Sequence, residues 1–135
     1  MNPDRILILA PHTDDGELGC GATISKFIEE GKEIFYVAFS ICEESVPDGF
    51  PKDILATEVK NATGILGINP ENLIIKKFKV RRFPEFRQQI LEEMVKLNRE
   101  IEPDLVFMPS SFDIHQDHKT IFEEGRRAFK KCSLL

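Results

Sequence analysis

The sequence predicts an α/β fold, a Rossmann-like three-layer sandwich around a mainly parallel sheet. Short apolar runs suited to strands alternate along the chain with segments of helical periodicity. The first run, residues 5–10, is apolar at every position from Ile6 to Ala10, as in a strand that is buried on both faces. The chain has 135 residues and is 41% hydrophobic, which suits one domain with a substantial core. Strands separated by helices pair in parallel through right-handed crossovers.

The first half of the chain provides two strand–helix units. Apolar residues recur at helical spacing over residues 17–30, and Gly31 ends that helix. Residues 33–40 are rich in β-branched and aromatic side chains and predict the second strand. Residues 41–52 contain two prolines and a glycine and predict a loop. A second helix is expected over residues 55–66.

The second half repeats the alternation. Residues 72–76 predict a short third strand. Pro84 opens the longest helix and Pro103 closes it, with apolar residues on one face between them. Residues 105–108 predict the fourth strand, and residues 117–131 a last helix.

Charge and composition exclude several classes of protein. The net charge of −5 disfavours general nucleic-acid binding, which requires the neutralisation of many phosphates. No apolar run has the roughly 20 residues of a membrane span, and residues 1–5 do not resemble the start of a signal peptide. Cys20, Cys42 and Cys132 are widely spaced and form no CxxC pair, so free thiols in a reducing cytoplasm are expected.

Two polar motifs follow two of the predicted strands. Residues 11–15 (Pro-His-Thr-Asp-Asp) come directly after the first strand, and residues 115–118 (His-Gln-Asp-His) follow the fourth after a short link. These motifs contain all three histidines of the chain. Ligands of parallel α/β sheets bind beyond the carboxyl ends of the strands. The motifs are therefore expected to meet in space, about a hundred residues apart in sequence.

The residue types in these motifs predict a metal site. His12 and Asp15 are three residues apart in a tight loop, and His118 can supply a third ligand, which leaves one position for water. Zinc is the expected ion, because two imidazoles and a carboxylate are typical of open zinc sites. Iron(II), cobalt(II) and manganese(II) suit the same ligands.

The remaining polar groups of the motifs suggest hydrolysis. Asp14 lies beside a ligand and can take a proton from the water as a general base. His115 can polarise a carbonyl, stabilise an oxyanion or protonate a leaving amine. Asp117, the third candidate catalytic residue, can orient a histidine through its ring N–H. Each motif alone is better explained as a turn or a helix cap, and only their co-occurrence favours the metal site.

The two motifs together resemble those of the PIG-L/LmbE-like N-acetylglucosaminyl deacetylases. Residues 11–15 are similar to the family's (P/A)HPDD motif, and residues 115–118 to its HxDH motif, in the same order and strand context. The resemblance implies that His12, Asp15 and His118 bind the metal, that Asp14 is the base, and that His115 assists at the oxyanion. It also implies a zinc-dependent enzyme that removes the N-acetyl group of an N-acetylglucosamine-type sugar or conjugate.

Two other functions remain open. The chain could be a non-catalytic or partly active binding or scaffold domain, or a metal-dependent hydrolase of another acyl bond such as an ester. The expected partner is a small N-acetylated amino sugar, with neither nucleic acid nor a membrane span. The glycines after the first strand are spaced GxxGxG and follow acidic residues, so no dinucleotide cofactor is expected.

The sequence departs from the family pattern at several positions, including Gly16, and in its length. Gly16 stands where many members have glutamate, with Glu17 following. Members of the family are also longer, so we expect residues 1–135 to be one deacetylase domain that lacks the C-terminal strands, the first of which would begin within residues 132–135. A sheet edge left uncovered in this way would favour association into homo-oligomers and weaken activity.

A basic cluster occupies residues 76–82 of this acidic protein. It comprises Lys76, Lys77, Lys79, Arg81 and Arg82. The cluster is either a solvated edge or a docking site for a phosphate on a nucleotide sugar or lipid-linked sugar. Phe112, just before the second motif, is the best candidate for an aromatic wall of the substrate pocket.

Overall fold

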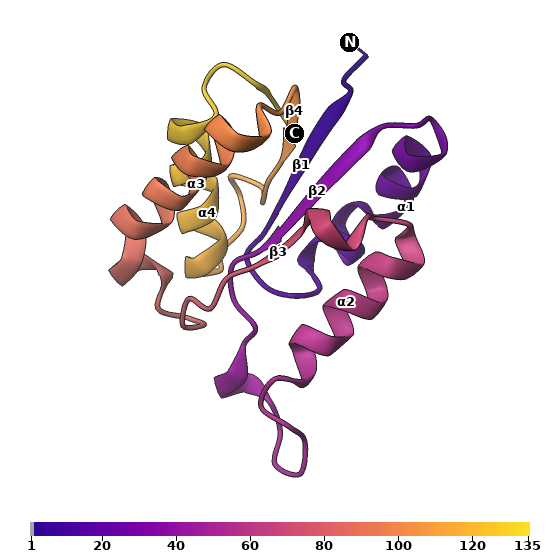
Figure 1. Cartoon of the computed structure of the whole chain (residues 1–135). Helices are drawn as coiled ribbons and strands as arrows, with labels where there is room; N and C mark the ends of the chain where they lie inside the picture. The colour runs from indigo at the N-terminus through magenta and orange to yellow at the C-terminus, as the bar shows by residue number, and fades with distance from the viewer. Residues whose placement is uncertain (1) are drawn as a thin grey trace.

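A computed structural model, which describes residues 2–135, confirms the α/β sandwich. Its five strands are all parallel and lie in the order β3-β2-β1-β4-β5 (Figure 1). The strand bounds are β1 Arg5–Ala10, β2 Glu33–Ala38, β3 Leu73–Ile75, β4 Leu105–Phe107 and β5 Ser133–Leu134.

Four α-helices cover the sheet in two layers. In Figure 1, α1 and α2 lie on one side of the sheet and α3 and α4 on the other. Their bounds are α1 Asp15–Glu29, α2 Ile54–Leu66, α3 Arg87–Ile101 and α4 Gln116–Ala128, and short 3₁₀ turns cover Glu43–Ser45, Pro70–Asn72 and Phe83–Phe86. Within residues 2–135, no helix combines the length and the apolar character needed to cross a bilayer.

The central strand β1 is apolar at every position after Arg5 because both of its faces are buried. Leu7 and Leu9 belong to the core under α3 and α4, whereas Ile6 and Ile8 belong to the core under α1 and α2. Successive side chains of a strand point to opposite faces, and here both faces are covered. The fully buried strand that the sequence predicts is therefore confirmed.

The strand order places the two polar motifs together. β1 pairs with β2 on one side and with β4 on the other, and Ile8 lies opposite Phe107. From β1 the chain adds β2 and β3 on one side of the sheet, and it then crosses over to add β4 and β5 on the other side. The carboxyl end of the β1–β4 pair is therefore a topological switch point. The loop that holds residues 11–15 and the link before α4 both leave the sheet there.

Several element boundaries differ from those that the sequence predicts. The first helix begins at Asp15 and not at residue 17, so one carboxylate of the first motif lies in its first turn. Pro84 opens a 3₁₀ turn, Phe83–Phe86, and the long helix α3 begins only at Arg87. The helix after the second motif ends at Ala128, because the chain must turn to bring residues 133–134 beside β4.

Candidate metal and active site

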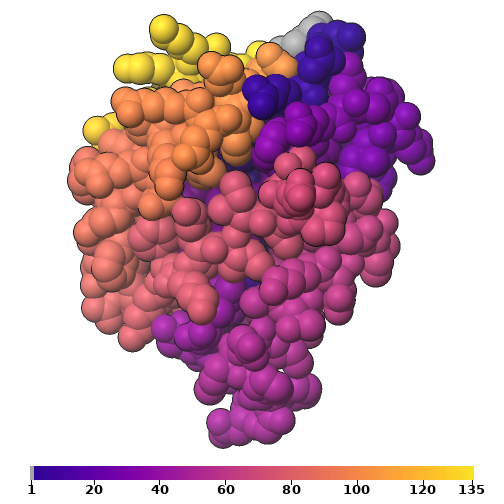
Figure 2. Space-filling model, in the orientation of Figure 1, coloured from indigo at the N-terminus to yellow at the C-terminus, as the bar shows by residue number. Residues whose placement is uncertain are grey.

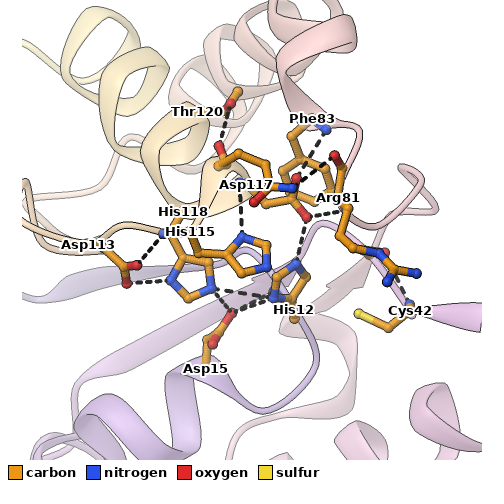
Figure 3. A network of polar contacts seen from close by, with 12 residues as sticks. His12, Asp15, Cys42, Arg81, Phe83, Asp113, His115, Asp117, His118 and Thr120 are labelled. Carbon is orange, nitrogen blue, oxygen red and sulfur yellow. Dashed lines mark hydrogen bonds and ion pairs between the residues drawn. The ribbon is translucent and has the colours of Figure 1, made fainter. Parts of the chain in front are cut away.

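Three side-chain atoms from the two motifs converge on one point. His118 Nε2 lies 3.2 Å from Asp15 Oδ2, and His12 Nδ1 lies 3.4 Å from both of these atoms (Figure 3). Ligands about 2.1 Å from a tetrahedral ion are separated from one another by about 3.4 Å. The geometry of these nitrogens and this oxygen therefore fits a single divalent ion.

A carboxylate holds the outer nitrogen of each of these imidazoles. His12 Nε2 lies 2.8 Å from Asp117 Oδ2, and His118 Nδ1 lies 2.7 Å from Asp113 Oδ2. When the outer nitrogen donates its proton to a carboxylate, the inner nitrogen of the neutral ring keeps a free lone pair. Both rings then present a lone pair at the point of convergence, as metal ligands must.

Asp117 is itself fixed by the backbone that precedes α3. Its side chain is fully buried, and it accepts hydrogen bonds from the amides of Arg81 (2.6 Å) and Phe83 (3.1 Å). Burial alone would raise the pKa of Asp117, but the hydrogen bonds from His12 and from these two amides lower it below its usual range. A charged carboxylate is thereby maintained behind His12.

The first turn of α1 supplies two carboxylates with different surroundings. Asp15 Oδ2 accepts a hydrogen bond from the backbone amide of His12 (2.8 Å). Burial would raise the pKa of Asp15, but the contact with His118, this amide and the nearby imidazoles lower it. Asp14, the N-cap residue, makes no capping hydrogen bond, is exposed and lines the adjacent pocket.

His115 lies beside the convergence point with its ring held by α4. As the N-cap of that helix, its Nδ1 accepts a hydrogen bond from the amide of Asp117 (3.1 Å), and its own amide donates to Asp113 (2.9 Å). Burial and the neighbouring His12 lower the pKa of His115. A neutral ring whose Nδ1 is an acceptor carries its proton on Nε2, so His115 offers a donor.

This cluster offers two possible sets of three ligands for a metal ion. The nearest atoms of His12, His115 and His118 all lie within 4.8 Å of one another, so three imidazoles are one set. The second set replaces His115 with Asp15. The second set fits better, because its separations of 3.2–3.4 Å match one coordination sphere and because the Nδ1 of His115 already accepts a helix-capping hydrogen bond.

A pocket of about 580 Å³ opens beside the cluster. His12, Asp14 and His115 form part of its lining, and Cys42, Leu55, Glu58 and Arg81 lie among the other lining residues. The segment between β2 and α2, which projects at the bottom of Figures 1 and 2, contributes Ser45 to its rim. Asp15 and His118 also border a second cavity, of about 660 Å³.

The structure adds residues that the sequence did not suggest and corrects one expectation. Asp113 reaches His118 from the link before α4, and no sequence pattern distinguishes it from an ordinary turn aspartate. The prediction that Phe112 forms a pocket wall is wrong, because its side chain is 91% exposed and lines neither cavity. The turn that aims Asp113 at His118 points its neighbour Phe112 outward.

Tyr36 fills the space beside Gly16. Its hydroxyl accepts a hydrogen bond from the amide of Gly16 (3.1 Å) and donates to the carboxylate of Glu17. Burial raises the pKa of Glu17 and of Tyr36. The tyrosine on β2 thus leaves no room for a side chain at position 16.

Comparisons with known proteins identify relatives of this chain. The chain is 27% identical over 123 residues to the diacetylchitobiose deacetylase of Thermococcus kodakarensis, covering 85% of this chain and 45% of the relative. It is 26% identical over 122 residues to an uncharacterized deacetylase of Escherichia coli, covering 87% of this chain and 64% of that protein. The chain therefore spans about half to two thirds of the length of these relatives.

Solved structures show the same fold. A conserved protein from Thermus thermophilus superposes with a TM-score of 0.77 at 29% identity, covering 98% of this chain and 60% of that one. The diacetylchitobiose deacetylase of Pyrococcus horikoshii superposes with a TM-score of 0.80 at 22% identity, over 93% of this chain and 49% of that one.

Membership in a family follows from the extent of the sequence match. Residues 7–129 match the PIG-L family, described as GlcNAc-PI de-N-acetylase. That range includes both polar motifs and all of α1, α2, α3 and α4. The chain belongs to the PIG-L family of deacetylases.

Proposed function

We propose that this protein is a zinc-dependent deacetylase that hydrolyses the N-acetyl group of an N-acetylglucosamine-type sugar or conjugate. The observation that carries the proposal is the convergence of His12 Nδ1, Asp15 Oδ2 and His118 Nε2 within 3.4 Å of one another beside an open pocket. The family and the named deacetylase relatives support the same class of reaction.

In this proposal His12, Asp15 and His118 bind the ion. When bound, a divalent metal would supply Lewis-acid chemistry, acidifying a water and polarising an acyl carbonyl. Asp117 and Asp113 hold the outer nitrogens of the two imidazoles and so fix the orientation of both rings. Zinc is the ion that we propose, because a His₂Asp set with an open position is typical of it.

Asp14 and His115 carry the proton chemistry in this proposal. Asp14 faces the pocket without a capping hydrogen bond, so its carboxylate is available to take the proton of the attacking water. His115 holds its Nδ1 on the amide of Asp117 and offers Nε2–H to the oxyanion that develops on the acyl group. Asp117 acts through His12 and is a positioning residue.

Acetate release tests this proposal directly. The chain is stripped with a chelator, reloaded with one equivalent of zinc, cobalt(II), iron(II) or manganese(II), and assayed on N-acetylglucosamine, diacetylchitobiose and a matched O-acetyl ester. We expect amide hydrolysis that requires metal. Metal-dependent cleavage of the ester alone would indicate a different hydrolase, and metal and sugar binding without release of acetate would indicate a binding domain.

A further inference from the structure

The structure divides the basic cluster of residues 76–82 into two cations that are ion-paired and three that have no ion pair within residues 2–135. Lys76 Nζ lies 2.6 Å from Glu93 Oε2, and Arg82 Nη2 lies 2.7 Å from Glu85 Oε2. Lys77 and Lys79 border a separate small cavity of about 50 Å³. Among the five basic residues, Arg81 is the one that lines the pocket beside the metal site.

The backbone of Arg81 is held by the same turn of α4 that carries the second motif. Its amide donates to Asp117 Oδ2 (2.6 Å), and its carbonyl accepts from Gln116 Nε2 (3.4 Å). Its φ of +66° is in the left-handed region, which costs a non-glycine residue on the order of 1 kcal/mol. A glycine would fit this backbone with less strain, so the presence of arginine calls for a role of the side chain.

The guanidinium of Arg81 is free to meet a ligand. Within residues 2–135 it makes no ion pair, and its side chain is exposed. In Figure 3 it extends away from Asp117 and past His12 toward Cys42, another residue of the pocket wall. A planar group with five donors is thus presented to the space next to the convergence point.

The other charged side chains that line the pocket are acidic, namely Asp14, Glu17 and Glu58. Three carboxylates in the same pocket disfavour a phosphate or carboxylate on the ligand, since like charges repel. Hydroxyl groups on the ligand are compatible with the guanidinium and with the carboxylates, because a hydroxyl accepts a hydrogen bond from a guanidinium and donates one to a carboxylate.

We infer that Arg81 is a specificity-determining residue that binds ring hydroxyls of a neutral N-acyl amino sugar. This inference rests on the proposed function, since it concerns the sugar on which that reaction acts. It also bears on the basic cluster: the one member that lines this pocket recognises an uncharged sugar ring and not a phosphate.

Three variants separate recognition from folding. Arg81→Met keeps the stem and removes the donors, whereas Arg81→Gly removes the side chain and relieves the left-handed strain. Arg82→Met is the matched control, because its guanidinium is paired with Glu85 and does not line the pocket. We expect Arg81→Gly to melt at or above the wild-type temperature, so that any lost binding cannot be attributed to unfolding.

The readouts are acetate release and, independently of turnover, binding to the zinc-loaded chain followed by NMR. The ligands are N-acetylglucosamine, its 6-phosphate and the hydroxyl-free N-acetylcyclohexylamine. We expect both Arg81 variants to lower kcat/KM and affinity for N-acetylglucosamine by about 10–100-fold, as for the loss of hydrogen bonds to a charged group. The hydroxyl-free amide and the Arg82→Met variant should change by less than about twofold.

The outcomes that would overturn the inference about Arg81 differ from the outcome that would contradict the proposed function. An equal loss on the hydroxyl-free amide, unchanged sugar binding in Arg81→Met, or no sugar binding by the wild type would overturn the inference. Tighter, Arg81-dependent binding of the 6-phosphate would overturn it in favour of an anion site. Arg81-dependent sugar binding without acetate release would support the inference and contradict the proposed function.

Discussion

His12 is constrained by a different carboxylate at each ring nitrogen. Its Nδ1 faces Asp15 at 3.4 Å, and its Nε2 lies 2.8 Å from the buried Asp117. The inner contact lies where an ion would bind, and the outer contact fixes the tautomer that leaves the inner lone pair free. One ring is thereby anchored to the loop after β1, to α4 and, through Asp117, to the backbone before α3.

Asp14 offers the clearest test of a single catalytic group. Asp14→Asn removes a proton acceptor but no ligand atom, so we expect zinc affinity within about threefold of wild type and acetate release lowered by about 10²–10⁴-fold. Asp48→Asn, an exposed carboxylate in the loop between β2 and α2, is the matched control. Calorimetry measures the metal and an acetate assay the turnover. Normal turnover or loss of the metal in Asp14→Asn would remove Asp14 from the role of base.

Most of the side chains that converge at the candidate site could be named from the sequence, but most of their contacts could not. Two motifs at strand ends are enough to gather His12, Asp15 and His118, because a parallel sheet brings such ends to one edge. That Asp117 holds His12 while Asp113 holds His118 depends on the path of residues 109–114 and on the turn at Arg81. Non-local contacts of this kind leave no local pattern in the sequence.

At the level of elements, the start of α1 packs against β2 without room for a side chain at position 16. A Cβ added to Gly16 would lie 2.4–2.7 Å from ring atoms of Tyr36, which is fully buried. We expect Gly16→Ala to destabilise the fold by about 1–3 kcal/mol, as overpacking does. Gly19→Ala, in the same helix with open space around it, is the control. Denaturant titration measures both, and equal stabilities would show that α1 can shift freely on the sheet.

The two helices of the other layer are joined by a buried carboxylate. Glu124 of α4 is fully buried and lies 2.8 Å from Arg87 Nε of α3 and 2.7 Å from Arg127 Nη1. Glu124→Gln removes the negative charge that faces the two half-exposed guanidiniums. We expect a loss of about 1–3 kcal/mol in the free energy of unfolding. Glu100→Gln, whose carboxylate is on the surface 3.9 Å from Lys96, should cost less than about 0.5 kcal/mol. A similar loss in both variants would contradict this assignment.

The elements themselves follow closely from the sequence. Strand β1 matches its predicted range because a continuous apolar run has no other stable place than the centre of a covered sheet. The start of α3 does not match, since Pro84 is compatible with the first turn of either a 3₁₀ or an α-helix. The 3₁₀ form is accompanied by tertiary contacts, in which the amide of Phe83 donates to Asp117 across the core.

For the whole molecule, the proposed metal site joins the two halves of the sheet. The proposed ligands come from the loop after β1, the first turn of α1 and α4, and β1 and β4 are paired through only three pairs of residues. A ligand that binds only the folded state stabilises it by about 2.7 kcal/mol at 100 times its Kd. We therefore expect saturating zinc to raise Tm by about 5–10 °C. Calorimetry with and without a chelator measures the shift, and an unchanged Tm would contradict a site that spans both halves.

The most direct test of the central claim is a zinc titration of the chelator-treated chain and two histidine variants. If His12, Asp15 and His118 form the coordination sphere, the wild type binds one equivalent, His118→Ala loses stoichiometric binding, and His115→Ala keeps one equivalent with an affinity within about tenfold, as for a residue outside that sphere. If His115→Ala loses the metal as completely as His118→Ala, or if His118→Ala binds zinc as tightly as the wild type, the assigned ligand set is wrong.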